Sequence, residues 1–330
     1  MALSFGLSLV SQAITAGGAT LNLQFAGATA IDSRITFTRA SSATFTGSNG
    51  LLQTAAVDAP RLTYNPTTLA AEGLLVEEQR TNLLLNTSVL VTQVVTVTAV
   101  THTLSFYGAG TVVLSGAATG TVVGTGAYPT RTTLIFTPIV GVLTVTVTGS
   151  VTSAQLEAGA FATSYIPTTT AQATRAADVA VMTGTNFSSW YNQSEGTFVA
   201  VYQRIASSLS GVLAANDNTA ANKVELRGSP VADSQMVVRT ASVGQVLINL
   251  GTFVANTVTS TAISYKQDDF IASQNGVNSA PDTLGTLPVV TQMRIGAIDS
   301  GTNTLNGNIK AIVYYPRRLT NTELQALTLS

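Results

Sequence analysis

Few side chains in this sequence could carry out acid–base or nucleophilic chemistry. There is no cysteine and one histidine, His102, so thiolate catalysis, Cys-ligated zinc and histidine-based triads have almost no material. We expect His102, in a Thr-rich strand, to be structural. Glycoside hydrolysis needs two carboxylates about 5–9.5 Å apart. Neighbours in a strand point to opposite faces, so Asp268 and Asp269 could share a cleft only in a turn. We therefore predict no enzymatic activity, and the remaining candidate carboxylates are Glu77, Glu78, Glu225, Asp233 and Asp299.

Glycan binding needs an aromatic platform and planar polar groups, often with a calcium ion held by oxygen ligands. The only tryptophan, Trp190, stands with Tyr191 and Asn192 in a polar stretch, and these three residues are the candidate glycan contacts. The alternative for Trp190 is a place at the end of a sandwich core. The sequence predicts no cofactor other than a candidate calcium ion, and its weak candidate ligands are Asp217, Asp268 and Asp299, of a residue type that also favours turns.

Charged residues are rare, at 9% of the chain, and a group of them gathers in residues 39–80. Arginine can form paired hydrogen bonds with carboxylates and with backbone carbonyls. Two interpretations follow. The charges either hold an irregular, strand-poor segment together or form a docking face for another protein. The residues concerned are Arg39, Arg61, Glu77, Glu78 and Arg80.

The composition predicts the elements that must position these residues. The 330 residues include 52 threonines, which are β-branched and favour strands, so we predict an all-β fold. A net charge of −1 gives no basic surface for nucleic acid. The longest apolar stretches fall short of the ~20 residues that span a bilayer. The N-terminus lacks the basic residues of a signal peptide, since the first is Arg34, and its alternation over residues 3–10 predicts a strand.

Hydrophobic patterning divides the chain into three parts. Residues 81–156 carry one charged side chain, Arg131, and their Val/Thr alternation predicts a small antiparallel sandwich. Further along, Asn275 and Gly276 predict a hairpin turn, and Thr320 with Glu323 forms the capping box of a terminal helix. The prediction is tandem antiparallel β-sandwiches, the last a jelly roll. The expected domains are a β-rich segment at 1–85, a small sandwich at 86–170, and the jelly roll at 171–330.

Four motifs carry a resemblance to a known family. They read FTRASSATF over residues 37–45, GLLQTA over 50–55, PRLTY over 60–64 and GLLVEEQRTNLL over 73–84. This run resembles a segment of tailed-bacteriophage virion proteins. QLEAG (155–159) and ATSYIPT (162–168) resemble the closing strand of a carbohydrate-binding-module-like sandwich in the same proteins. Parts of residues 195–320 are similar to concanavalin A-like lectin and LamG domains.

The resemblance implies a virion component, of the tail-fibre, spike, head-fibre or decoration type, assembled in the host cytoplasm. It implies that residues 1–85 dock to other virion proteins and that the lectin-like part attaches to host surface polysaccharide. A purely architectural part without a specific ligand is the alternative. Such proteins are usually homotrimers, and the charge-poor 81–156 stretch also favours cover by sister subunits. No nucleic acid and no membrane is expected among the partners.

Overall fold

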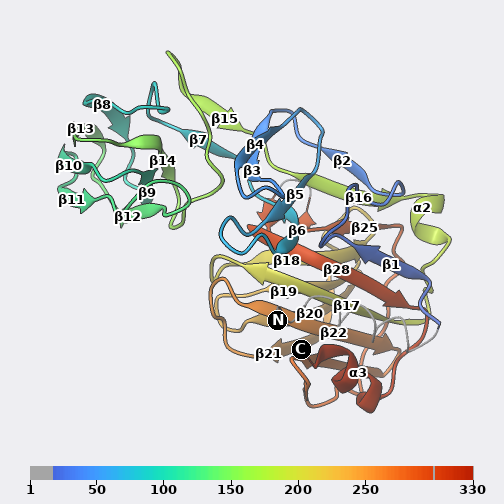
Figure 1. Cartoon of the computed structure of the whole chain (residues 1–330). Coiled ribbons are helices and arrows are strands. Elements are labelled where there is room, and N and C mark those ends of the chain that lie inside the picture. Colours follow the sequence, from blue (N-terminus) through green and yellow to red (C-terminus); the bar gives the residue numbers. More distant parts are fainter. Residues whose placement is uncertain (1–17, 300–301, 330) are drawn as a thin grey trace.

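The computed structural model describes residues 18–299 and 302–329 and confirms an all-β chain with two antiparallel sandwiches (Figure 1). The larger sandwich has two sheets. The first runs in the order β24-β23-β22-β17-β28-β6-β5, with β1 also paired to β28. Its strands are β1 (Leu21–Gln24), β5 (Arg61–Tyr64), β6 (Ala71–Val76), β17 (Glu195–Arg204), β22 (Val258–Lys266), β23 (Asp269–Gln274), β24 (Val277–Asn278) and β28 (Gly307–Tyr315).

The second sheet of the larger sandwich runs in the order β2-β16-β25-β18-β19-β20-β21. Alternate side chains of both sheets, such as Phe198, Leu213, Met236 and Ile263, meet in one buried core, as the period of two in a strand requires. The strands are β2 (Thr36–Thr38), β16 (Val179–Thr183), β18 (Ser210–Asn216), β19 (Lys223–Gly228), β20 (Ser234–Thr240), β21 (Val243–Leu250) and β25 (Gln292–Ile295).

The N-terminal part differs from the predicted separate segment at 1–85. Strands β1, β5 and β6 complete the first sheet of the larger sandwich, and β2 completes the second. Leu21 lies opposite Tyr314, almost 300 residues away in sequence, because the alternating Leu21 and Leu23 bury their side chains in the shared core. The hairpin of β3 (Ala43–Thr46) and β4 (Leu52–Ala55) pairs only with itself among the described strands. The strand predicted at 3–10 lies outside the described residues.

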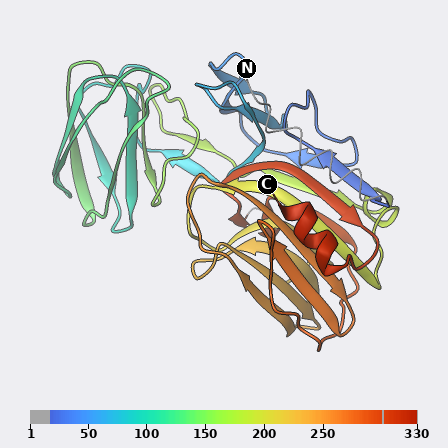
Figure 2. The same ribbon diagram turned by 60° about the horizontal axis from the view of Figure 1, so that its bottom comes forward.

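The small sandwich stands beside the larger one (Figure 2). Its four-stranded sheet, β11-β10-β13-β8, packs against a three-stranded sheet, β12-β9-β14, around a core that includes Leu104, Phe106 and Leu143. The paired strands β7 (Arg80–Asn82) and β15 (Ala173–Arg175) lead into and out of it. Its strands are β8 (Gln93–Val97), β9 (His102–Tyr107), β10 (Thr111–Gly116), β11 (Gly120–Val123), β12 (Thr132–Phe136), β13 (Gly141–Thr148) and β14 (Thr152–Ala158).

The predicted terminal helix is confirmed as α3 (Asn321–Thr328). Thr320 and Glu323 form the capping box, and Leu324 and Leu327 pack on the outer face of the first sheet, against residues such as Val313. In the described part of the chain, none of the helices has the length and hydrophobicity of a membrane span. The remaining elements are α2 (Thr185–Ser188), β26 (Ala297–Asp299) and β27 (Thr302–Thr304).

Candidate functional site

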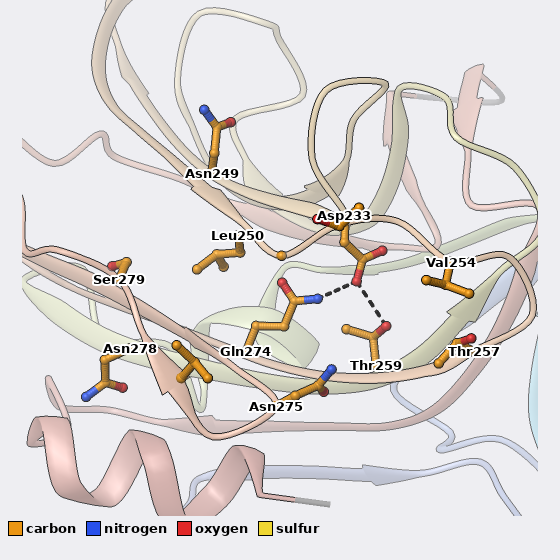
Figure 3. A pocket seen from close by; sticks show the side chains of 13 residues that line it. Asp233, Asn249, Leu250, Val254, Thr257, Thr259, Gln274, Asn275, Asn278 and Ser279 are labelled. Carbon is orange, nitrogen blue, oxygen red and sulfur yellow. Dashed lines mark hydrogen bonds between the residues drawn. The ribbon is translucent and has the colours of Figure 1, made fainter.

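A groove of about 440 Å³ opens at one end of the larger sandwich, where its two sheets approach each other (Figure 3). Strand β21 and the residue before β20 in the second sheet, and strands β22, β23 and β24 of the first sheet, supply its walls. Strand ends suit such a site because their side chains are fixed by the sheet while the adjoining loops stay accessible. The lining residues are Asp233, Asn249, Leu250, Gly251, Thr252, Val254, Thr257, Thr259, Gln274, Asn275, Val277, Asn278 and Ser279.

Asp233, which is 5% exposed, forms the charged floor of the groove. One carboxylate oxygen accepts a hydrogen bond from the buried Arg204 at 3.0 Å. The other accepts from Thr259 at 3.1 Å and from the amide of Gln274 (Figure 3). The guanidinium of Arg204 also lies over the ring of Phe253, 4.5 Å from its centroid. Both carboxylate oxygens therefore have partners within the protein, and Arg204 balances the charge of Asp233.

The rim of the groove offers neutral hydrogen-bonding groups. Asn249 and Asn275 are exposed, while Asn278 is half-buried and donates to the carbonyl of Asn321 at 3.0 Å. The carbonyl oxygen of the Asn278 side chain is buried and has no hydrogen-bond partner. A buried acceptor without a partner costs free energy, and because this oxygen is closed off from solvent it is not offered to a ligand in the groove. Carboxamides both donate and accept, which matches the hydroxyl groups of a neutral polyol.

A second polar cluster lies on the outer face of the second sheet. The carboxylate of Glu225, which is fully buried, sits between Lys223 at 2.9 Å and Arg227 at 2.9 Å. Arg227 also donates to Gln235 at 2.9 Å, and Gln235 donates to Asn249 at 2.6 Å. This network reaches the rim of the groove through Asn249. Lys223 and Arg227 both pair with Glu225, so this candidate carboxylate is held in an ion cluster on the face of the sheet.

Asp268 and Asp269 meet the condition of lying at a turn, since Asp268 lies in the turn between β22 and β23 and Asp269 begins β23. Their side chains nevertheless have separate partners. Asp268 accepts from the backbone of Gly285 at 3.0 Å, whereas Asp269 pairs with Arg318 at 2.9 Å. The two carboxylates are therefore held by different elements.

Of the predicted glycan contacts at 190–192, Trp190 lies in the core, and Tyr191 and Asn192 are partly buried next to it. Trp190 is 4% exposed, and its indole donates to the carbonyl of Asn186 at 2.7 Å. Tyr191 stacks on Tyr314 with ring centroids 5.3 Å apart, and burial raises the pKa of its hydroxyl well above the usual range. Asn192 donates to the carbonyl of Pro316 at 2.8 Å. The alternative interpretation of Trp190, a core cap, describes the structure, because the burial of its ring leaves no face for a sugar.

The charged group of the N-terminal part holds the junction of the molecule together. Arg61, fully buried, binds Glu77 at 2.7 Å and Asp178 at 2.5 Å. Arg39 reaches the other oxygen of Asp178 at 3.0 Å, and Arg175 reaches Glu77 at 3.1 Å. Because these side chains are buried, they offer no docking face, and the stapling interpretation describes them. Sequence reasoning missed Arg175 and Asp178, although two charges so close together in a charge-poor chain were a usable signal.

The junction network also reaches the small sandwich. Ser164, which follows the last strand of that sandwich, donates to Glu77 through its backbone at 2.7 Å and its hydroxyl at 2.6 Å. Burial raises the pKa of the Glu77 carboxyl, but the charges of Arg175 and Arg61 and the hydrogen bonds from Ser164 lower it to about 2. Glu78 and Arg80 pair with each other nearby, at 2.5 Å.

The candidate calcium ligands are not brought together. Asp217 accepts from Thr219 and Asn222 within its own turn, and Asp268 lies in the turn between β22 and β23. Asp299 ends strand β26. Among residues 18–299 and 302–329, no three acidic or histidine side chains form a metal-binding group. His102 is buried, and its ring bonds the carbonyl of Val100 at 2.7 Å, as expected of a structural histidine.

No protein-family model and no curated protein matches this chain. Among solved structures, the CBM40 of Ruminococcus gnavus IT-sialidase bound to alpha2,3 sialyllactose is 16% identical, with a TM-score of 0.37, over 43% of this chain and 86% of that one. A Trypanosoma rangeli sialidase mutant is 17% identical (TM-score 0.36), over 46% of this chain and 26% of that one. A mutant of NanB sialidase from Streptococcus pneumoniae is 13% identical, with a TM-score of 0.37, over 44% of this chain and 26% of that one. Likeness at this level assigns neither a family nor a ligand.

Fold and groove together define the class of this protein. It is an all-β chain of two antiparallel sandwiches, and the larger one carries a groove lined by carboxamides and hydroxyls.

Proposed function

We propose that this chain is a non-catalytic, glycan-binding component of a tailed-bacteriophage virion, and that the groove above Asp233 is its glycan site. The observation that supports the glycan site is the groove itself, which is lined by neutral donors and acceptors above a buried carboxylate. The absence of a free charge favours a neutral sugar over an anionic one, since Asp233 is occupied by Arg204.

The virion assignment rests on the resemblance of residues 37–84 and 155–168 to virion proteins. Immunogold labelling of intact particles with antibody against the purified chain tests it. Labelling at the tail or on the head is expected, and unlabelled particles would contradict the virion role while leaving the glycan site to its own test.

Binding at this groove is expected to be weak. The site is open, and none of its thirteen lining residues is aromatic, so stacking on a ring contributes nothing there. We expect a dissociation constant near the millimolar range, about −4 kcal/mol. Several copies on one particle would raise the effective affinity, because the second and later contacts are intramolecular.

A glycan array, followed by titration with the sugars that bind, tests this site. The variant Asn249→Ala should weaken binding about tenfold, because it removes hydrogen bonds to the ligand. Asn22→Ala changes an exposed asparagine on β1, away from the groove, and should bind like the wild type. Equal affinity in all three proteins, with the folds intact, would remove the groove as the site.

A purely architectural role is the second candidate, and the missing aromatic platform favours it. An array without any bound glycan would support it. Release of reducing ends from a bound polysaccharide would instead contradict the non-catalytic half of the proposal, and would direct attention to Asp233 and Glu225. Each of these tests needs the full chain, because β1, β2, β5 and β6 are parts of the larger sandwich.

A further inference from the structure

A small cavity lies where three parts of the chain meet. It has a volume of about 220 Å³ and takes residues from the small sandwich, from the hairpin of β3 and β4, and from strands such as β6 and β28 of the larger sandwich. Ligand pockets occur preferentially at such interfaces between domains. The cavity shares no residue with the groove above Asp233, so it is a separate candidate site.

Aromatic rings, which the groove lacks, form part of the wall of this cavity. Phe45, Tyr107 and Tyr128 are among its lining residues. Tyr107 and Tyr128 meet edge to face, with ring centroids 5.2 Å apart and an angle of 66° between the ring planes. At this angle the two rings form a corner, and neither covers both faces of the other. Phe45 and Tyr128 are half-buried, so part of each ring remains accessible to a ligand.

The hydroxyl group of Tyr107 is available for a hydrogen bond. Tyr107 is 8% exposed, and its hydroxyl makes no hydrogen bond with any residue in 18–299 or 302–329. Unlike the side-chain oxygen of Asn278, this hydroxyl is not closed off from solvent. Burial raises the pKa of Tyr107, so the hydroxyl keeps its proton and can both donate and accept. A nearly buried side chain with an unused hydroxyl therefore lines the cavity.

Two charged side chains line the same cavity, and neither forms an ion pair within the described part of the chain. The carboxylate of Glu72 accepts hydrogen bonds from two carboxamides, at 3.3 and 3.4 Å. Arg131 donates to the carbonyl of Thr163 at 2.5 Å and to the hydroxyl of Ser105 at 2.7 Å. A ligand hydroxyl can donate to the carboxylate and accept from the guanidinium, so it suits both groups. Their charges cancel, which favours neither a cation nor an anion.

We infer that this cavity binds a single ring of a neutral sugar. The apolar face of the sugar ring would lie against Tyr128, and its hydroxyls would bond to Tyr107, Glu72 and Arg131. A sugar is the ligand class that uses all of these groups, because it combines a face of C–H groups with hydroxyls that donate and accept. The volume is below the range of about 300–1,000 Å³ that is typical for drug-sized ligands, so one ring fits better than a chain.

A sugar in this cavity would contact both sandwiches and the hairpin. Its site differs from the groove proposed above, and the inference depends on neither the groove nor the virion role. The full chain is needed for the test, because the cavity is incomplete without any one of these three parts.

Saturation-transfer NMR with the methyl glycosides of glucose, galactose and mannose, followed by titration, tests the inference. At least one glycoside should bind. Tyr107→Phe and Glu72→Gln should each weaken this binding about fivefold to tenfold, because each removes or weakens a hydrogen bond to the sugar. Tyr107→Phe removes a hydroxyl without a partner, so the fold should stay intact and the loss should appear in binding alone.

The ring of Tyr128 is tested by a matched pair of variants. Tyr128→Ala should weaken binding about tenfold, because the apolar contact with the sugar is lost. Tyr128→Phe keeps the ring and should bind within about twofold of the wild type, since only the hydroxyl bond to Thr46 is removed. Glucosamine and glucuronic acid should bind no more tightly than glucose.

The groove variant Asn249→Ala separates the two sites and should bind the glycosides like the wild type. Four results would overturn the inference. These are a panel in which no glycoside binds, unchanged affinity in both Tyr107→Phe and Glu72→Gln, equal loss in the two Tyr128 variants, and tighter binding of a charged sugar. Loss of binding in Asn249→Ala with none in the cavity variants would also overturn it, because the sugar would then lie in the groove.

Discussion

Replacement of Glu77 by glutamine should destabilise the protein severely although it removes no atoms of bulk. The carboxylate of Glu77 is buried and lies 2.7 Å from Arg61 and 3.1 Å from Arg175. Its neutralisation leaves Arg61 with Asp178, which Arg39 also binds, and removes the carboxylate with which Arg175 forms its ion pair. Breaking a buried ion pair on one side typically costs about 3–5 kcal/mol.

The lowered pKa of Glu77 leads independently to a similar free energy of stabilisation. A fall from 4.5 to about 2 in the folded protein corresponds to about 3 kcal/mol. Because the pKa is lower in the folded state, the folded protein binds fewer protons, and this stabilisation is fully present above pH about 4.5. It is lost as the pH falls from about 4.5 to about 2. The Glu77→Gln variant should lack this part of the acid dependence.

Urea unfolding monitored by fluorescence provides the assay. Trp190 is the single tryptophan and is buried in the larger sandwich, so its emission reports the unfolding of that sandwich. Glu323→Gln is the matched control, because Glu323 pairs with Arg317 at the surface and glutamine also suits a capping box. The control should lose less than about 1 kcal/mol. If Glu77→Gln loses no more than Glu323→Gln, the junction network does not hold the sandwich as argued.

Four further outcomes are expected. Thr320→Ala removes the cap of α3 and should cost about 1 kcal/mol in thermal unfolding. Gly73→Ala should cost more, at least about 1 kcal/mol, because Gly73 has φ +94° and an added Cβ would lie 2.1 Å from the carbonyl oxygen of Ile309. Burial raises the pKa of Tyr314 to about 12, so ultraviolet titration should show it protonated at pH about 11 until the protein unfolds. Trp190→Phe should lower stability and leave glycan affinity unchanged.

The sequence predicted those helices, turns and strands that depend on residues close together in the chain. The capping box at Thr320 begins α3, and Asn275 and Gly276, both at positive φ, form the turn between β23 and β24. Val/Thr alternation predicted the small sandwich because one face of each strand is buried there. These features depend on neighbours a few residues apart, which a single sequence displays.

Pairings between distant segments could not be predicted in this way. Strand β1 finds its partner around Tyr314, and nothing in the local pattern of residues 21–24 specifies that distance. The same limit applies to the site. Trp190 was a candidate glycan contact because its neighbours in sequence are polar, with a place in the core as the alternative. Phe198 and Tyr314, on strands β17 and β28, enclose it. The groove collects its residues from four strands and the loops beside them, so no single motif marks it.

The location of the junction network changes what the family resemblance can mean. The motifs at 37–84 contain Arg39, Arg61 and Glu77, and these side chains are buried where the N-terminal strands, the small sandwich and the larger sandwich meet. Substitution of one partner would leave a buried charge without its counterion. The fold therefore constrains the identity of these residues. The motifs therefore report how the two sandwiches are joined. The groove residues, from Asp233 to Ser279, lie outside these motifs, so the resemblance carries no information about the groove.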